Sequence, residues 1–221
     1  RGRVNEAIHL YALAPIQQAG QLLNEKKYTQ FTKTSLNYYL DNCNTSVFTA
    51  PNSMTHFFSY IQEALVEFGF HEDVRKTLKD VMDYQQKMGG VSAYADVPWV
   101  CLPGQAQLAK IWFMLGDHEN GDKALSFMES FQNPSGGFFG SVGVGADYFP
   151  DQELSSAVKY YIDAKLLSIE SHFDANEHVF PQDIQDNDPR LTSVLGGFGD
   201  LSHKTILDAG CGKGRFAKKI K

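Results

Sequence analysis

The chain has 221 residues, of which 43% are hydrophobic and 13% aromatic, and it carries a net charge of −6. This composition supports a packed core and excludes an intrinsically disordered chain. The acidic balance argues against a general nucleic-acid binder. No run of about 18 apolar residues occurs in the sequence, so we expect no membrane span.

The three cysteines are Cys43, Cys101 and Cys211. They are too few and too scattered for a disulfide framework or for a zinc site of the CxxC type. We therefore expect reduced thiols, no metal site and a cytoplasmic location. No positive-then-apolar signal segment opens the sequence, which agrees with that location. The chain opens on Arg1 and not on Met, so we expect a start that has been processed or cut.

Apolar residues at helical spacing predict seven helices before residue 173. The first begins near Val4 and is kinked or restarted at Pro15. Asn52 or Ser53 is expected to cap the third helix, and Asp151 the seventh. The helices after the first cover approximately residues 28–42, 54–68, 74–86, 104–116, 120–132 and 152–170.

Part of this helical pattern occurs twice at a fixed distance. Four pairs of positions differ by the same number of residues, since 132−85, 136−89, 150−103 and 152−105 all equal 47. A period near 47 with two helices per unit is typical of stacked helical hairpins. We therefore expect helices 74–86 and 120–132 to be equivalent, and likewise 104–116 and 152–170. Gln105 and Gln152 are expected to tie loops to helices in the two units. The matching segments are Tyr84-Gln85, Gly89-Gly90 and Pro103-x-Gln105 in the first unit, and Phe131-Gln132, Gly136-Gly137 and Pro150-x-Gln152 in the second.

The turn Gln132–Ser141 resembles the Q-x3-GG-F/W-G turns of the terpenoid cyclase and protein prenyltransferase superfamily. The resemblance covers about residues 55–164, including the stretch Trp99–Gln105, and implies a partial α/α toroid. The superfamily's Asp-x-Asp-Asp acid motif is missing, and Asp96 and Cys101 lack the spacing of its zinc-binding Asp-x-Cys. The resemblance therefore extends to the fold and not to that superfamily's chemistry.

After residue 173 the pattern changes. Residues 174–200 are polar and acidic and contain two prolines, which indicates a linker, with Leu191–Leu195 as one short helix. Lys204–Asp208 then has the pattern of a buried strand. It is followed at once by Gly210-x-Gly212-x-Gly214 and the start of a helix at Arg215, which is typical of a nucleotide-binding turn.

The string Ile206-Leu-Asp-Ala-Gly-Cys-Gly-Lys-Gly214 resembles motif I of the class I S-adenosylmethionine-dependent methyltransferases. The resemblance implies that S-adenosylmethionine is the cofactor and that Asp208, Gly210, Gly212 and Gly214 contribute to its site. The predicted fold is thus mainly α. A partial α/α toroid of hairpin repeats (1–173) and a linker (174–200) precede the first βα unit of a Rossmann-like methyltransferase domain (201–221).

This organisation predicts a methyltransferase whose toroid recognises the acceptor, and a glycan or a lipid-linked sugar is expected from fold analogy. As alternatives, the toroid is itself a carbohydrate- or isoprenoid-acting enzyme, such as a lyase, epimerase or cyclase, or it is a non-catalytic interaction module.

A catalytic toroid needs an acid and a base. Its candidate residues, expected to converge on one concave mouth, are His56, Tyr94, Asp96, Trp99 and Tyr148. Trp99 and Tyr148 are suited to stacking on sugar rings. In the alternative interpretation, His56 is a hydrogen-bonded structural residue and the loop residues only fasten their loops.

Overall fold

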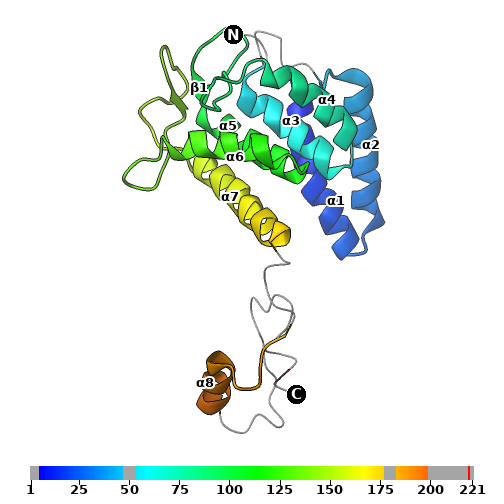
Figure 1. Ribbon diagram of the computed structural model, residues 1–221. Coiled ribbons are helices and arrows are strands. Elements are labelled where there is room, and N and C mark those ends of the chain that lie inside the picture. The colour runs from blue at the N-terminus through cyan, green and yellow to red at the C-terminus, as the bar shows by residue number, and fades with distance from the viewer. Residues whose placement is uncertain (1–4, 47–52, 177–182, 199–218, 220–221) are drawn as a thin grey trace. The chain divides into compact units, whose positions relative to one another are not determined.

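The computed structural model describes residues 5–46, 53–176, 183–198 and 219. The chain divides into two compact units, residues 1–171 and 172–221. We call the first unit the helical body. Its helices follow one another as hairpins in chain order, as Figure 1 shows, and the prediction of a mainly α fold is confirmed.

The helical body opens with a hairpin. A 3-10 helix, η1 (Glu6–Ala12), continues into α1 (Leu13–Leu22), which α2 (Lys26–Asn42) follows. Asn5 caps η1, because its side chain accepts a hydrogen bond of 3.0 Å from the Ala7 backbone N–H. Pro15 lies in the first turn of α1, just after the change from 3-10 to α geometry, so the predicted restart near Pro15 is confirmed.

Two further hairpins repeat each other. The first consists of α3 (Thr55–Glu67) and α4 (His71–Met82), and the second of α5 (Leu102–Met114) and α6 (His118–Glu129). All four helix bounds differ by 47 residues, since 102−55, 114−67, 118−71 and 129−82 are equal. The predicted equivalence of α4 and α6 is confirmed.

The connection inside each hairpin also repeats. Gly69 and Gly116 follow α3 and α5 with φ angles of 87° and 75°, a left-handed conformation that glycine adopts at little cost. The backbone hydrogen bond from Gly69 to Val66 recurs as that from Gly116 to Phe113, both at 2.9 Å. The two connections therefore share one backbone geometry.

Helix α7 (Ser155–Ala175), which follows the two hairpins, departs from this offset. It begins 53 residues after α5, since 155−102 = 53. The sequence prediction of a 47-residue offset is therefore wrong by six residues for this pair. Pro103 and Gln105 lie in the first turn of α5, whereas Pro150 and Gln152 lie in a turn that precedes α7.

Two predicted caps are wrong. The N-cap position of α3 is Met54, which makes no side-chain cap, so Ser53 does not serve there. Asp151 lies four residues before α7 begins and is not its cap. Asn52 lies outside the described residues.

Helix α5 is at the centre of the core. Leu108, Ile111 and Trp112 are buried against Phe58 and Ile61 of α3, in a cluster that also includes residues of η1, α4 and α6. Two glycines permit close helix packing. A Cβ atom on Gly121 of α6 would lie 2.7 Å from the Phe113 ring, and one on Gly104 of α5 would lie 2.6 Å from the His56 backbone nitrogen. The start of α5 therefore approaches the start of α3 closely.

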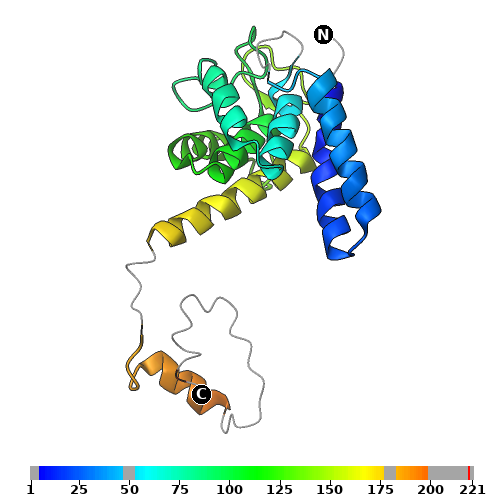
Figure 2. The same ribbon diagram turned by 90° about the vertical axis from the view of Figure 1, so that its right-hand side faces the viewer.

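A small sheet joins the two long loops of the helical body. Strand β1 (Val100–Cys101) pairs antiparallel with β2 (Ser141–Val142), with Val100 opposite Val142. The two views of Figures 1 and 2 place α7 beside α5 and α6 and the α1–α2 hairpin beside α3. Among the described residues, no helix combines the length and the apolar character needed to cross a membrane.

The second unit contains α8 (Pro189–Phe198), which confirms the short helix predicted at Leu191–Leu195. Leu191 is buried, and Asp188 accepts a hydrogen bond of 2.9 Å from the Arg190 backbone N–H. The predicted strand Lys204–Asp208 and the glycine turn 210–214 lie outside the described residues.

Candidate functional site

Helices α3, α5 and α7 carry polar residues at equivalent positions, and we call these three helices the α3–α5–α7 layer. The ninth residue of each is charged: Glu63, Lys110 and Asp163, since 63−55, 110−102 and 163−155 are equal. The sixth residues are Tyr60, Gln107 and Tyr160. Positions three apart lie on the same face of a helix, so these six side chains form two adjacent polar rows.

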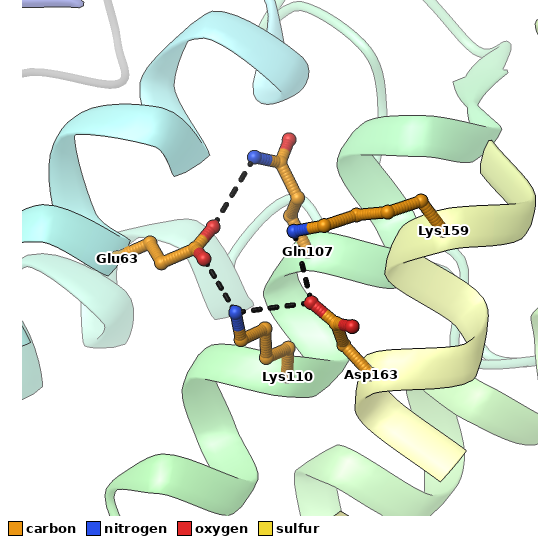
Figure 3. A network of polar contacts seen from close by, with 5 residues as sticks. All are labelled: Glu63, Gln107, Lys110, Lys159 and Asp163. Atoms are coloured by element: carbon orange, nitrogen blue, oxygen red, sulfur yellow. Dashed lines mark hydrogen bonds and ion pairs between the residues drawn. The ribbon is translucent and has the colours of Figure 1, made fainter. Parts of the chain in front are cut away.

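The charged row joins the three helices. Lys110 Nζ lies 2.5 Å from Glu63 Oε1 and 3.2 Å from Asp163 Oδ2, as Figure 3 shows. Lys159 Nζ approaches the same Asp163 oxygen at 2.9 Å. The Glu63 and Lys110 side chains are only 4% and 15% exposed, so this pair is largely shielded from water.

Two groups of the row, Lys110 and Asp163, are held in their charged forms. Burial acts to lower the pKa of Lys110, but the Glu63 and Asp163 carboxylates outweigh it, and the pKa is raised. Burial likewise acts to raise the pKa of Asp163, but Lys159 and Lys110 outweigh it, and that pKa is lowered. Negative and positive charges thus alternate across the layer.

Gln107 connects the charged row to His56. Its Nε2 donates a long hydrogen bond of 3.5 Å to Glu63 Oε2, and its Oε1 lies 2.6 Å from His56 Nδ1. The close approach at Gly104 makes this contact possible, because it brings the first turn of α5 beside the first turn of α3. A continuous polar path therefore runs from Lys159 through Asp163, Lys110 and Glu63 to Gln107 and His56.

Tyrosines surround the His56 ring. The ring centroids of Tyr60, Tyr148 and Tyr160 lie 4.8, 6.2 and 6.2 Å from that of His56. They come from α3, from the loop after β2 and from α7. Tyr11 of η1 adds an edge-on contact to Tyr60 at 4.6 Å. Four separate segments of the helical body thus meet at this point.

The environment fixes the protonation of these groups. Burial lowers the pKa of His56, and the hydrogen bond with Gln107 offsets only part of this effect. Burial raises the pKa of Tyr60, and it raises that of Tyr148 to about 12. At neutral pH the site therefore combines a neutral imidazole, which can accept a proton, with phenols, which can donate one.

The sequence-predicted candidates are only partly brought together. Tyr94, Trp99 and Tyr148 belong to one apolar cluster with Met54 and Cys101. Trp99 is 2% exposed, so the expectation that it stacks on a sugar ring is wrong. The Tyr94 ring packs edge-on against Trp99 at 5.8 Å.

The other two candidates differ in their surroundings. Asp96 is exposed in the loop before β1. His56 is 4% exposed and lies beside Tyr148, and it makes the hydrogen bond that the structural interpretation expects.

Gln105 ties its loop to α5, as predicted. Its Oε1 accepts from the Val91 N–H at 2.8 Å, and its Nε2 donates to the Gly89 and Ala124 carbonyls at 2.9 and 3.2 Å. The expectation for Gln152 is wrong, because that residue is exposed and precedes its helix. In the second copy of the sequence repeat the neighbouring Glu153 accepts hydrogen bonds from Asn133 and Ser135.

Most residues of the site were not predicted from the sequence. The missed residues are Tyr60, Glu63, Gln107, Lys110, Tyr160 and Asp163. A signal for one pair existed, because 110−63 equals the 47-residue offset and places Glu63 and Lys110 at the same position of the repeat. Opposite charges at one repeat position favour contact between neighbouring units.

Other features of the chain lie apart from this site. A surface hollow of about 630 Å³, lined by residues that include Leu40, Phe70 and Asp73, shares no residue with it. Among the described residues, no group of three His, Cys, Asp or Glu side chains could hold a metal ion. Asp208, Gly210, Gly212 and Gly214 lie outside the described part of the chain.

Comparison of the chain with protein-family models, with curated proteins and with solved structures finds no match.

Proposed function

We propose that this chain belongs to an S-adenosylmethionine-dependent methyltransferase in which the helical body binds the methyl acceptor. The observation that carries the proposal is the string from Ile206 to Gly214, in which a predicted strand, an acidic residue and three glycines at alternate positions stand directly before a predicted helix. Gly210, Gly212 and Gly214 suit close approach of the backbone to the cofactor.

The acceptor proposed is a glycan or a lipid-linked sugar. Two observations support a sugar. Tyr60 and Tyr148 are half-buried aromatic side chains, and such rings combine an apolar face with a hydroxyl group that can hydrogen-bond. Tyr60 belongs to one polar row of the α3–α5–α7 layer, and both tyrosine rings lie near the ring of His56. The amide and charged groups of the two rows suit hydroxyl recognition.

Cofactor binding tests the proposal. In this fold the adenine and ribose contacts come from strands later than the first, so a form of the protein that continues past Lys221 is compared with the 221-residue chain. Calorimetric titration with S-adenosylmethionine should show micromolar binding by the longer form and none by the shorter.

In the longer form, Asp208→Ala should weaken binding about tenfold or more, because a hydrogen bond to a charged group is lost. Lys213→Gln changes a residue between the glycines and serves as the matched control, with binding expected within about twofold of the unchanged protein. Equal losses in the two variants, or no binding by the longer form, would contradict the proposal.

A second function, acid–base catalysis by the helical body itself, is favoured by the surroundings of His56. A neutral imidazole can take a proton from a substrate, and a neighbouring tyrosine hydroxyl can return one to a departing or re-forming group, so no further reactant is needed. Elimination and epimerisation of acidic sugars are reactions of this kind.

This second function is tested with the full chain and uronic-acid polysaccharides. Elimination is followed by the ultraviolet absorbance of the unsaturated product, and epimerisation by incorporation of solvent deuterium at the reacting carbon. Activity should be lost in His56→Asn and retained in His172→Asn, since His172 is exposed. Activity that persists in His56→Asn would assign the base elsewhere.

A further inference from the structure

The path of polar contacts ends at the His56 ring, and the donor and acceptor of each hydrogen bond near this end can be assigned. Glu63 can only accept hydrogen bonds when ionised, and it is 4% exposed and bound to Lys110. The group of Gln107 that faces Glu63 must therefore be its NH₂ group, at 3.5 Å (Figure 3). The amide orientation of Gln107 is thus dictated by the carboxylate.

This orientation decides which nitrogen of His56 carries the proton. With its NH₂ group toward Glu63, Gln107 presents its carbonyl oxygen to His56 Nδ1 at 2.6 Å. A carbonyl oxygen only accepts, so Nδ1 must be the donor. In a neutral imidazole the other nitrogen, Nε2, then carries the free lone pair.

The remaining neighbours leave that lone pair available. Among the described residues, no hydrogen bond to Nε2 accompanies the one made by Nδ1. Phe57 of α3 stacks on the ring with centroids 5.7 Å apart. Among the described residues, the titratable groups whose rings lie near that of His56 are tyrosines, and Gln107 connects the ring to the charged Glu63. These tyrosines are Tyr60 of α3, Tyr148 of the loop after β2 and Tyr160 of α7.

We propose that Gln107 is a positioning residue that holds His56 with its proton on Nδ1 and so makes Nε2 the proton acceptor of the helical body. The Glu63–Lys110 pair sets the orientation of Gln107. A neutral amide suits this task, because it selects one tautomer without adding a charge that would stabilise the imidazolium form.

The consequence for reactivity rests on the acid–base function proposed above, but the tautomer itself does not. Tautomer and titration can be measured in the absence of any substrate. A failure of the catalytic assay with the expected tautomer present would remove the function and leave the positioning role. The opposite tautomer would remove the positioning role whatever the activity.

The test is nitrogen NMR of the full chain labelled at histidine, with His56 assigned by its loss in His56→Asn. Near pH 7, Nδ1 of His56 should have the shift of a protonated nitrogen and Nε2 that of an unprotonated one. In Gln107→Leu the preference should be lost, and the Nε2-protonated form should become the larger population. A His56 that is Nε2-protonated in the unchanged protein, or whose tautomer is unaffected by Gln107→Leu, would overturn the proposal.

Two further variants control for folding. Gln152→Leu changes an exposed glutamine and should leave the His56 signals unchanged. Gln107→Glu retains an acceptor at Nδ1, so the tautomer should be kept, while the added charge should raise the His56 titration midpoint by about one pH unit or more. If Gln107→Leu does not fold, as judged by circular dichroism, an unchanged midpoint in Gln107→Glu would overturn the proposal.

Discussion

The turn after α4 and the turn after α6 have the same backbone but are fastened to the next helix by different groups. In both turns a glutamine side chain closes the loop on itself. Gln85 Nε2 donates to the Gly89 carbonyl at 3.2 Å, and Gln132 Nε2 donates to the Gly136 carbonyl at 3.0 Å. The two glycines have φ angles of 97° and 86°. The local structure of the turn is thus the same in both copies of the repeat.

The attachment to the following helix differs. The first turn is held by the buried Gln105, which lies within α5. The second is held by the exposed Glu153, which lies before α7. A turn depends on its own glycines and amide, whereas a tie to another element depends on where that element begins. Because α7 begins six residues later than the repeat requires, the second turn needs a different partner.

The largest effect is expected where the two hairpins meet. Glu63 and Lys110 occupy the same position of the repeat, and Lys110→Met leaves a carboxylate that is 4% exposed without its partner. Such a loss should lower the free energy of unfolding by about 4 kcal/mol. The measurement is urea unfolding of the full chain. Lys159→Met removes an ion pair of a side chain that is 46% exposed and should cost no more than about 1 kcal/mol. Equal costs would show that the charged row does not hold the hairpins together.

The equivalent glycines of the two turns provide a closer comparison. A Cβ atom on Gly89 would lie 2.5 Å from the Lys123 carbonyl oxygen, whereas one on Gly136 would meet nothing within 4 Å. Both substitutions by alanine strain the positive φ, but only Gly89→Ala also forces backbone apart. We expect losses of about 3 kcal/mol for Gly89→Ala and about 1 kcal/mol for Gly136→Ala in thermal unfolding. Similar losses would mean that the first turn is no more tightly packed than the second.

The buried tie comes next in size. Gln105→Leu leaves the buried Val91 N–H without its acceptor and should cost about 2 kcal/mol. Gln152→Leu, at the matching position of the sequence repeat, should stay within about 0.5 kcal/mol of the unchanged protein. Amide hydrogen exchange at Val91 should accelerate in Gln105→Leu alone. A comparable loss of stability in Gln152→Leu would show that Gln152 and Gln105 have equivalent roles after all, although the helix bounds place them differently.

These contrasts show what the sequence could and could not reveal. The glycine pairs at 89–90 and 136–137 predicted the turns, because a backbone position with positive φ is usually occupied by glycine. The 47-residue offset predicted the equivalence of α4 and α6, because these turn glycines are among the positions that repeat at that offset. Pro150 and Gln152 match Pro103 and Gln105 in residue type but not in structural position. Helix α7 begins six residues later than the 47-residue offset requires, so Pro150 and Gln152 precede their helix instead of lying within it.

The site was less accessible to prediction. Trp99 lies in a loop, where exposure was expected, but its ring fills an apolar cluster with Met54 and Cys101. Glu63 and Lys110 were not among the residues predicted for the site. Their contact depends on the register between α3 and α5, which Gly104 sets by close approach, and such a register follows from packing and not from periodicity.

The smallest effect should appear in the response of the two ties to pH. Gln105 does not titrate, so the gap in stability between the unchanged protein and Gln105→Leu should be constant across the acid range.

Hydrogen bonds from Ser135 and Asn133 hold the pKa of Glu153 below its ordinary value of 4.5. A carboxyl group with a lowered pKa in the folded protein contributes stability above its unfolded pKa and loses it as the pH falls through the folded value. The gap between the unchanged protein and Glu153→Gln should therefore be present at pH 7 and close below about pH 4.5. Denaturation midpoints measured from pH 7 to 3 test this directly. A gap for Glu153→Gln that persists at the acid end would mean that shape, and not charge, fastens the second turn, and the two ties would then work alike.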